Sequence, residues 1–105
     1  MKITQVQQSA ATKRISAGRW VYTLKCSKAL RDAIEEEDYE AIITVLQLAY
    51  DELFDAELID LDDRTTYIDE LDYYDVEDEE IADDLDYELA EFYDLCDAIG
   101  VWVEI

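Results

Sequence analysis

The chain has 105 residues, half of them hydrophobic, which is the size of one ordinary domain with one core. It carries 29 Asp and Glu against 8 Lys and Arg, a net charge of -21 that far exceeds what solubility requires. It has no histidine, the commonest general base and metal ligand, and its two glycines, Gly18 and Gly100, lie too far apart for a glycine-rich phosphate loop. We therefore expect a non-enzymatic protein without cofactor or metal, whose charge serves binding.

The charge is divided sharply along the chain. Residues 1–31 hold seven of the eight basic residues and no acid, whereas residues 32–105 hold all 29 acids and only Arg64 as a cation. The predicted organisation is a single domain, 1–105, with a basic β-hairpin in 1–26, an acidic helical region in 27–99 and a terminal strand in 101–105. The expected fold class is α+β, a small antiparallel sheet packed with three to four acidic helices.

The predicted hairpin has strands at 11–16 and 19–26 that flank a turn at Gly18. The second strand is rich in β-formers, and alternation places Trp20, Tyr22 and Leu24 on one face. An isolated hairpin is marginal in water. We therefore expect the strand 101–105 to complete the antiparallel sheet.

Two helices are predicted to follow the hairpin. Ser27 is the expected N-cap of a helix over 27–37, and Asp38 that of a second helix over 39–55. Apolar residues cover most of the circumference of the second helix. It is therefore placed at the centre of the fold.

Two more helices are predicted in the acidic half. A shorter one is expected over 64–73, with an Asp or Thr as its cap. In the last one, over 78–99, apolar residues recur every three or four positions: Ile81, Leu85, Leu89, Phe92, Cys96 and Ile99. Gly100 is expected to end this helix in the left-handed conformation.

The two cysteines, Cys26 and Cys96, are interpreted as core or boundary thiols. The sequence shows no apolar signal segment and no dense cysteine framework, which favours a reducing cytoplasm. The longest apolar run, 41–50, is too short to span a bilayer, and an anionic surface is repelled by anionic lipid. No membrane association is expected.

Acidic clusters invite a comparison with calcium-binding loops. In 60–65 the third ligand position is Arg64 and the required glycine is Thr65, and 75–80 lacks the glycine as well. We expect a diffuse cloud of cations around the carboxylates and no specific metal site.

The outer surface of the last helix and the segment before it form the candidate partner-binding surface. Carboxylates recur there every three or four positions, so that neighbouring charges lie about 4.5–6 Å apart. The candidate residues are Asp69, Glu70, Asp72, Asp75, Glu77, Glu79, Glu80, Asp83, Asp84, Asp86, Tyr87, Glu91 and Asp94.

The aromatic residues admit two interpretations. Tyrosines near the acids could stack on arginine at an interface, but Tyr67, Tyr74 and Tyr93 are expected at the edge of the core. The core is also the favoured position for Trp20 and Trp102.

In size and in the helical spacing of its acids, above all over 69–97, the chain resembles phage-encoded DNA-mimic inhibitors of CRISPR and restriction nucleases. DNA carries one phosphate per about 3.4 Å on each strand, a density that helical carboxylates approach. The resemblance implies an inhibitor that occupies the DNA-binding groove of a host-defence nuclease, a CRISPR effector before a restriction enzyme. The expected partner is a basic nucleic-acid-binding protein, and direct nucleic-acid binding is not expected.

Two alternatives belong to other functional classes. One is an acidic chaperone or assembly factor that shields a basic protein by charge alone. The other is a homodimer or larger homo-oligomer in which the basic segment of one chain meets the acidic helices of another.

Overall fold

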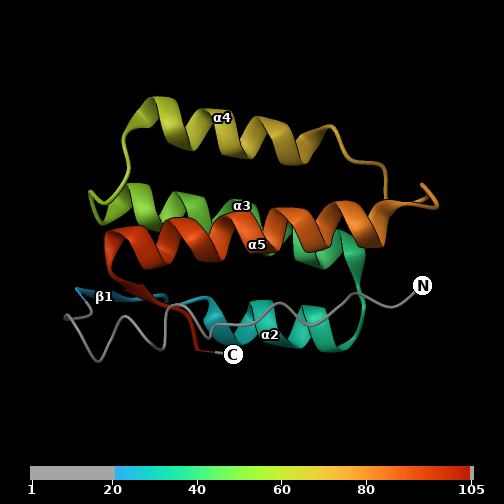
Figure 1. Cartoon of the computed structure of the whole chain (residues 1–105), viewed down its shortest axis with the longest axis horizontal. Coiled ribbons are helices and arrows are strands. Elements are labelled where there is room, and N and C mark those ends of the chain that lie inside the picture. Colours follow the sequence, from blue (N-terminus) through green and yellow to red (C-terminus); the bar gives the residue numbers. More distant parts are fainter. Residues whose placement is uncertain (1–20, 105) are drawn as a thin grey trace.

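Four helices and two short strands make up residues 21–104, the part of the chain that the computed structural model describes. In chain order they are β1 (Tyr22–Thr23), α2 (Ser27–Glu35), α3 (Tyr39–Asp55), α4 (Leu61–Asp72), α5 (Ile81–Ile99) and β2 (Val101–Trp102). Figure 1 shows α4 along one edge, α3 and α5 in the middle, and α2 with the two strands along the other edge. The α+β class is confirmed, with helices as its main content.

Helix α3 is the centre of the packing, as its continuous apolar surface predicts. Helices α2, α4 and α5 all contact it, and Ile42, Leu46 and Leu53 are fully buried. The ring of Tyr50 stacks on Tyr67 of α4 at 4.6 Å and meets Phe92 of α5 edge-on at 5.2 Å. Offset stacked and edge-on rings add to the burial energy, so this trio joins three helices.

The predicted antiparallel sheet is wrong, because β1 and β2 pair in parallel. Tyr22 lies opposite Val101 and Thr23 opposite Trp102. Helix α5 ends at the same end of the molecule where β1 begins, so the chain leaves both points in the same direction (Figure 1). The helical region is a long crossover connection of the kind that parallel strands need.

The predicted hairpin is tested only in part. Its turn at Gly18, its first strand at 11–16 and Trp20 lie outside the described residues. Within residues 21–26, β1 pairs with β2. The expected alternation is present, because Leu24 is buried and Tyr22 half-buried while Thr23 and Lys25 are exposed.

Side-chain caps fix two of the helix starts. The predicted cap Asp38 accepts a hydrogen bond from the Ala41 amide (3.2 Å), and Asp60 accepts one from the Asp63 amide (2.8 Å). Capping by Asp60 starts α4 three residues before the predicted position. Gly100 ends α5 with φ 78°, in the left-handed conformation that was predicted.

Two predicted helix starts are corrected. The N-cap of α2 is Cys26, and the Ser27 hydroxyl instead donates to the Leu24 carbonyl (2.6 Å). Helix α5 begins at Ile81 and not at residue 78, because the Asp78 side chain accepts from the Glu80 amide (2.9 Å) and holds a turn there. Such short-range bonds from Asp compete with helix formation.

Two glutamates take the left-handed conformation in which glycine is usual. Glu37 (φ 53°) ends α2 and Glu57 (φ 62°) ends α3. At each helix end, the amide of the glutamate donates to the carbonyl three residues before it. The amide of the next residue donates to the carbonyl five residues before itself, as in a Schellman motif. The first of these motifs ends α2 at Glu35, before the predicted end at 37. In this left-handed conformation a residue with a Cβ atom has a higher conformational energy than glycine.

A carboxylate of α3 holds the corner between β1 and α2. Glu52 accepts hydrogen bonds from the Tyr22 hydroxyl (2.7 Å), the Lys25 amide (2.5 Å) and the Cys26 amide (3.2 Å). These amides precede the first turn of α2, where no side chain of α2 itself caps the helix. Glu52 therefore attaches the sheet and α2 to the central helix.

Candidate functional site

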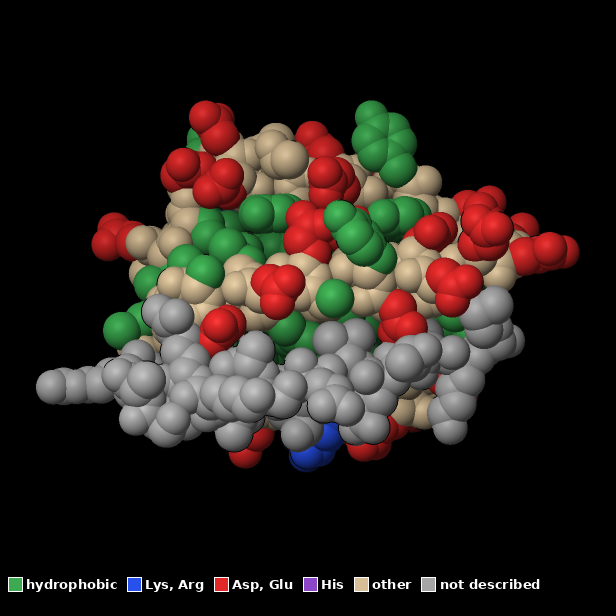
Figure 2. Space-filling model, viewed as in Figure 1, with side chains coloured by type: hydrophobic (Ala, Val, Ile, Leu, Met, Phe, Trp, Pro, Cys, Tyr) green, Lys and Arg blue, Asp and Glu red, His purple; other side chains and the backbone are tan. Residues whose placement is uncertain are grey.

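The predicted partner-binding residues are mostly exposed. Asp84, Asp86 and Glu91 are half-buried, and the exposed ones are Asp69, Glu70, Asp72, Asp75, Glu77, Glu79, Glu80, Asp83, Tyr87 and Asp94. Figure 2 shows carboxylates over much of one broad face, with hydrophobic side chains between them. They are gathered most densely at the end of the molecule where α4 connects to α5 (Figures 1 and 2).

Backbone-anchored side chains fix the connection between α4 and α5. Asp75 accepts a hydrogen bond from the Glu77 amide and Asp78 one from the Glu80 amide, both at 2.9 Å. The Asp78 amide donates in turn to the Asp75 carbonyl at 3.0 Å. The carboxylates of this connection are therefore carried on a defined turn.

The structure divides the predicted residues between two sides of α4. Glu70 faces α5, where it lines one pocket with Tyr87 and Glu91. Asp72 instead faces α3 and accepts a hydrogen bond from Gln47 Nε2 (2.6 Å). Only some of the predicted acids of α4 therefore lie beside those of α5.

On α5 the predicted acids also project in different directions. Asp84 and Glu91 are seven residues apart and share the side that faces α4, whereas Asp83 and Asp94 are exposed on the outer side. Asp86 stands two positions from Asp84, so it projects from another side of the helix.

Within residues 21–104, cations neutralise little of this charge. Residues 21–104 contain all 29 acids but only Lys25, Lys28, Arg31 and Arg64 as cations. Arg64 pairs with Asp51, and Arg31 lies 3.7 Å from Asp32. Both pairs involve acids outside the predicted binding set.

Sequence reasoning missed Glu88, which is 4% exposed. Its Oε1 atom accepts a hydrogen bond from the Tyr74 hydroxyl (2.6 Å). Burial raises the pKa of Glu88, and the charges of Glu91 and Glu70 raise it further, while the Tyr74 hydrogen bond lowers it. The signal in the sequence is an acid within the apolar stripe of α5, three residues after Leu85 and four before Phe92.

Glu88 belongs to a pocket between the end of α4 and the middle of α5. The pocket measures about 470 Å³ and is lined by Glu70, Tyr73, Tyr74, Tyr87, Glu88 and Glu91. Burial, followed by the charge of Glu70, raises the pKa of Glu91 as well. We name this cavity between α4 and α5 the tyrosine pocket. It combines a buried carboxylate, two further carboxylates and three phenol rings.

The tyrosines expected at the edge of the core are found there. Tyr67 and Tyr74 are half-buried and pack against the core, and Tyr93 belongs to it. Trp102 is half-buried. Tyr73 and Tyr87 differ from them in being largely exposed.

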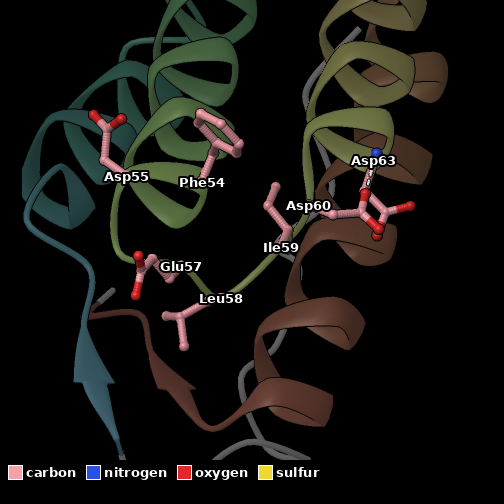
Figure 3. A pocket seen from close by; sticks show the side chains of 7 residues that line it. All are labelled: Phe54, Asp55, Glu57, Leu58, Ile59, Asp60 and Asp63. Atoms are coloured by element: carbon pink, nitrogen blue, oxygen red, sulfur yellow. Dashed lines mark hydrogen bonds between the residues drawn. The ribbon is translucent and has the colours of Figure 1, made fainter.

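A second hollow lies at the opposite end of the molecule, between α3 and α4. It is lined by Phe54, Asp55, Glu57, Leu58, Ile59, Asp60 and Asp63. Figure 3 shows the carboxylates of Asp55 and Glu57 well away from those of Asp60 and Asp63, where Asp60 caps α4. In the described part of the chain, no three potential ligand side chains are grouped to hold a metal ion.

Both thiols are free and shielded from ionisation. Burial raises the pKa of Cys26 to about 12, with the Glu52 charge as the next cause. The pKa of Cys96, which is buried, is raised in the same way. Neither thiol is an activated nucleophile, since reactivity requires the thiolate.

No protein family, curated protein or solved structure matches this chain. Among the helices of residues 21–104, none has the length and apolar character needed to cross a bilayer.

Proposed function

We propose that this protein is a non-enzymatic inhibitor that imitates the DNA phosphate backbone and occupies the nucleic-acid-binding groove of a host-defence nuclease, a CRISPR effector before a restriction enzyme. The observation that carries the proposal is the succession of exposed carboxylates along the chain from the end of α4 through the 73–80 connection to the first turn of α5, with no lysine or arginine between residues 65 and 104.

The spacing of this surface suits the proposed role. Acids three or four residues apart on a helix are spaced about 4.5–6 Å along the helix axis, and each DNA strand carries one phosphate per about 3.4 Å of its axis, so the two charge densities are of the same order. The described part of the molecule is 40 Å long, the length of about twelve base pairs. A groove that accepts that length of duplex could accept the molecule lengthwise.

Rigidity supports the same proposal. α4 and α5 are both packed on α3, and the turn between them is held by the hydrogen bonds of Asp75 and Asp78. Charges on a fixed frame lose little conformational entropy when they bind. A disordered acidic tail would attract the same proteins, but with a larger ordering cost.

The test is competition with duplex DNA. The protein is incubated at physiological salt with a panel of purified CRISPR and restriction nucleases and with basic control proteins that bind no DNA. We expect capture of a nuclease, release of the protein by excess duplex, and loss of DNA cleavage. Equal binding to all basic controls would contradict mimicry and favour the chaperone.

A matched pair of variants separates position from total charge. Glu79→Gln, Glu80→Gln and Asp83→Asn remove three exposed charges near the α4–α5 turn, and Asp55→Asn, Glu57→Gln and Asp62→Asn remove three exposed charges near the opposite end. We expect the first triple variant to lose about tenfold or more in affinity and the second to lose much less. Equal losses would mean that net charge alone drives binding.

A further inference from the structure

The tyrosine pocket presents two aromatic rings to solvent from two different helices. Tyr73 at the end of α4 is 86% exposed and Tyr87 on α5 is 67% exposed. Neither ring contributes to the core, so folding gives no account of its size or position. Exposed tyrosines beside a pocket are typical anchors of protein interfaces.

The interior of the pocket is anionic. Glu88 lies almost fully buried at its wall, fixed by the Tyr74 hydroxyl, and Glu70 and Glu91 approach it from α4 and from the next turn of α5. None of the residues that line it is a lysine or an arginine. Like charges held this close destabilise one another until a cation binds between them.

We propose that the tyrosine pocket receives one arginine side chain of the partner protein. The planar guanidinium can stack on Tyr73 or Tyr87 and at the same time donate several hydrogen bonds to Glu88 and Glu91. A lysine ammonium is a compact, strongly hydrated charge that cannot form both contacts as well. The pocket volume of about 470 Å³ accommodates one such side chain.

This inference rests on the proposed function in one respect, that the partner is a basic protein. It adds a specificity that phosphate imitation alone does not provide. A phosphate-like surface attracts lysine and arginine similarly, whereas the tyrosine pocket selects arginine.

The test uses single amino-acid probes, so that the overall attraction between opposite charges stays small. Protein labelled with ¹³C at its tyrosine rings is titrated with N-acetyl-arginine amide and, separately, with N-acetyl-lysine amide at about 0.15 M salt. We expect saturable shifts confined to the rings of Tyr73, Tyr74 and Tyr87, with arginine binding about threefold tighter than lysine.

Variants identify the groups responsible. Tyr73→Ala with Tyr87→Ala should abolish the arginine preference, and both positions are exposed enough to leave folding intact. Glu88→Gln, which keeps an acceptor for the Tyr74 hydroxyl, should weaken arginine binding at least threefold. Leu48→Ala with Leu61→Ala, which trims two exposed apolar side chains elsewhere, is the matched control. It should change neither the preference for arginine over lysine nor the affinity for arginine.

Equal binding of the two probes, or an arginine preference that survives loss of both tyrosines, would overturn the pocket proposal. If duplex competition succeeds in that case, phosphate mimicry stands and the pocket alone is wrong. If no nuclease of the panel is captured but N-acetyl-arginine amide still shifts the three rings selectively, the pocket is supported and the proposed function fails.

Discussion

Glu52 and Glu88 are the same side chain on adjacent helices, placed in contrasting surroundings. Glu52 on α3 accepts three hydrogen bonds, two of them from backbone amides. Glu88 on α5 accepts one, from a tyrosine, and has Glu70, Asp84 and Glu91 as charged neighbours. The first carboxylate is satisfied by the fold, and the second is surrounded by groups that oppose its charge.

The contrast separates structural acids from acids available for binding. Where the fold needs a carboxylate, as at Glu52, Asp38 and Asp60, its oxygens face amides. In the tyrosine pocket the donor to Glu88 is a side chain, the Tyr74 hydroxyl. Stability measurements should therefore respond in opposite ways to changes at the two sites.

The largest effect is expected for Glu52→Ala. This change leaves the Tyr22 hydroxyl and the amides of Lys25 and Cys26 without their acceptor, so the free energy of unfolding should fall by about 2–3 kcal/mol. Urea denaturation measures it. Asp55→Ala, an exposed position on the same helix, is the control and should lie within about 0.5 kcal/mol of the wild type. If the free energy of unfolding were the same for Glu52→Ala and Asp55→Ala, Glu52 would not be a structural acid.

A smaller effect of opposite sign is expected for Glu88→Gln. The amide oxygen still accepts from Tyr74 while the buried charge is removed, so stability at pH 7 should rise by up to about 1 kcal/mol. A loss of stability comparable to that of Glu52→Ala would contradict the assignment of Glu88 as an acid held for a cation.

Two carboxyls of the tyrosine pocket predict how stability depends on pH. The pKa values of Glu88 and Glu91 are raised in the folded state above the ordinary value of 4.5, so the folded protein binds more protons than the unfolded chain just above that pH. Stability should therefore fall as pH rises through this range and be regained as pH falls towards 4.5. Thermal melts should show a shallower pH slope for Glu88→Gln. An unchanged slope would mean that other acids dominate the titration.

The smallest effect is expected at the end of α3. Glu57→Gly removes the Cβ from a left-handed residue and should stabilise the fold by about 0.5 kcal/mol, since the gain is partly offset by the greater freedom of glycine in the unfolded chain. Urea denaturation of the variant and the wild type side by side can resolve this difference in the free energy of unfolding. Ala90→Gly, at an exposed position inside α5, should instead destabilise by about 1 kcal/mol. If both changes destabilise, the left-handed conformation of Glu57 carries no strain.

Local signals in the sequence predicted the helices well, and long-range geometry accounts for the failures. The apolar stripe of α5, the caps Asp38 and Gly100 and the central place of α3 follow from patterns within a few residues. The direction of β2 depends on where α5 ends relative to β1, about eighty residues earlier. No local pattern carries that information.

The candidate site was predictable to a similar degree. Exposure of most of the acids follows from helical periodicity, but their division between the two sides of α4 depends on how α4 is rotated against α3. Tyr74 and Glu88 come from different elements and meet only in the folded protein. Glu88 is absent from the predicted set because an acid is expected at the surface by default, although its position on the apolar stripe of α5 indicates burial.

The parallel pairing of β1 with β2 also bears on the order in which the protein can fold during synthesis. The partner of Tyr22 is Val101, which leaves the ribosome about eighty residues later. Helices α2 and α4 can pack on α3 earlier, but the Leu24 amide stays without its partner, the Trp102 carbonyl, until β2 emerges. Nascent chains stalled before residue 101 should therefore remain open to proteases near β1, and emergence of β2 should close that site.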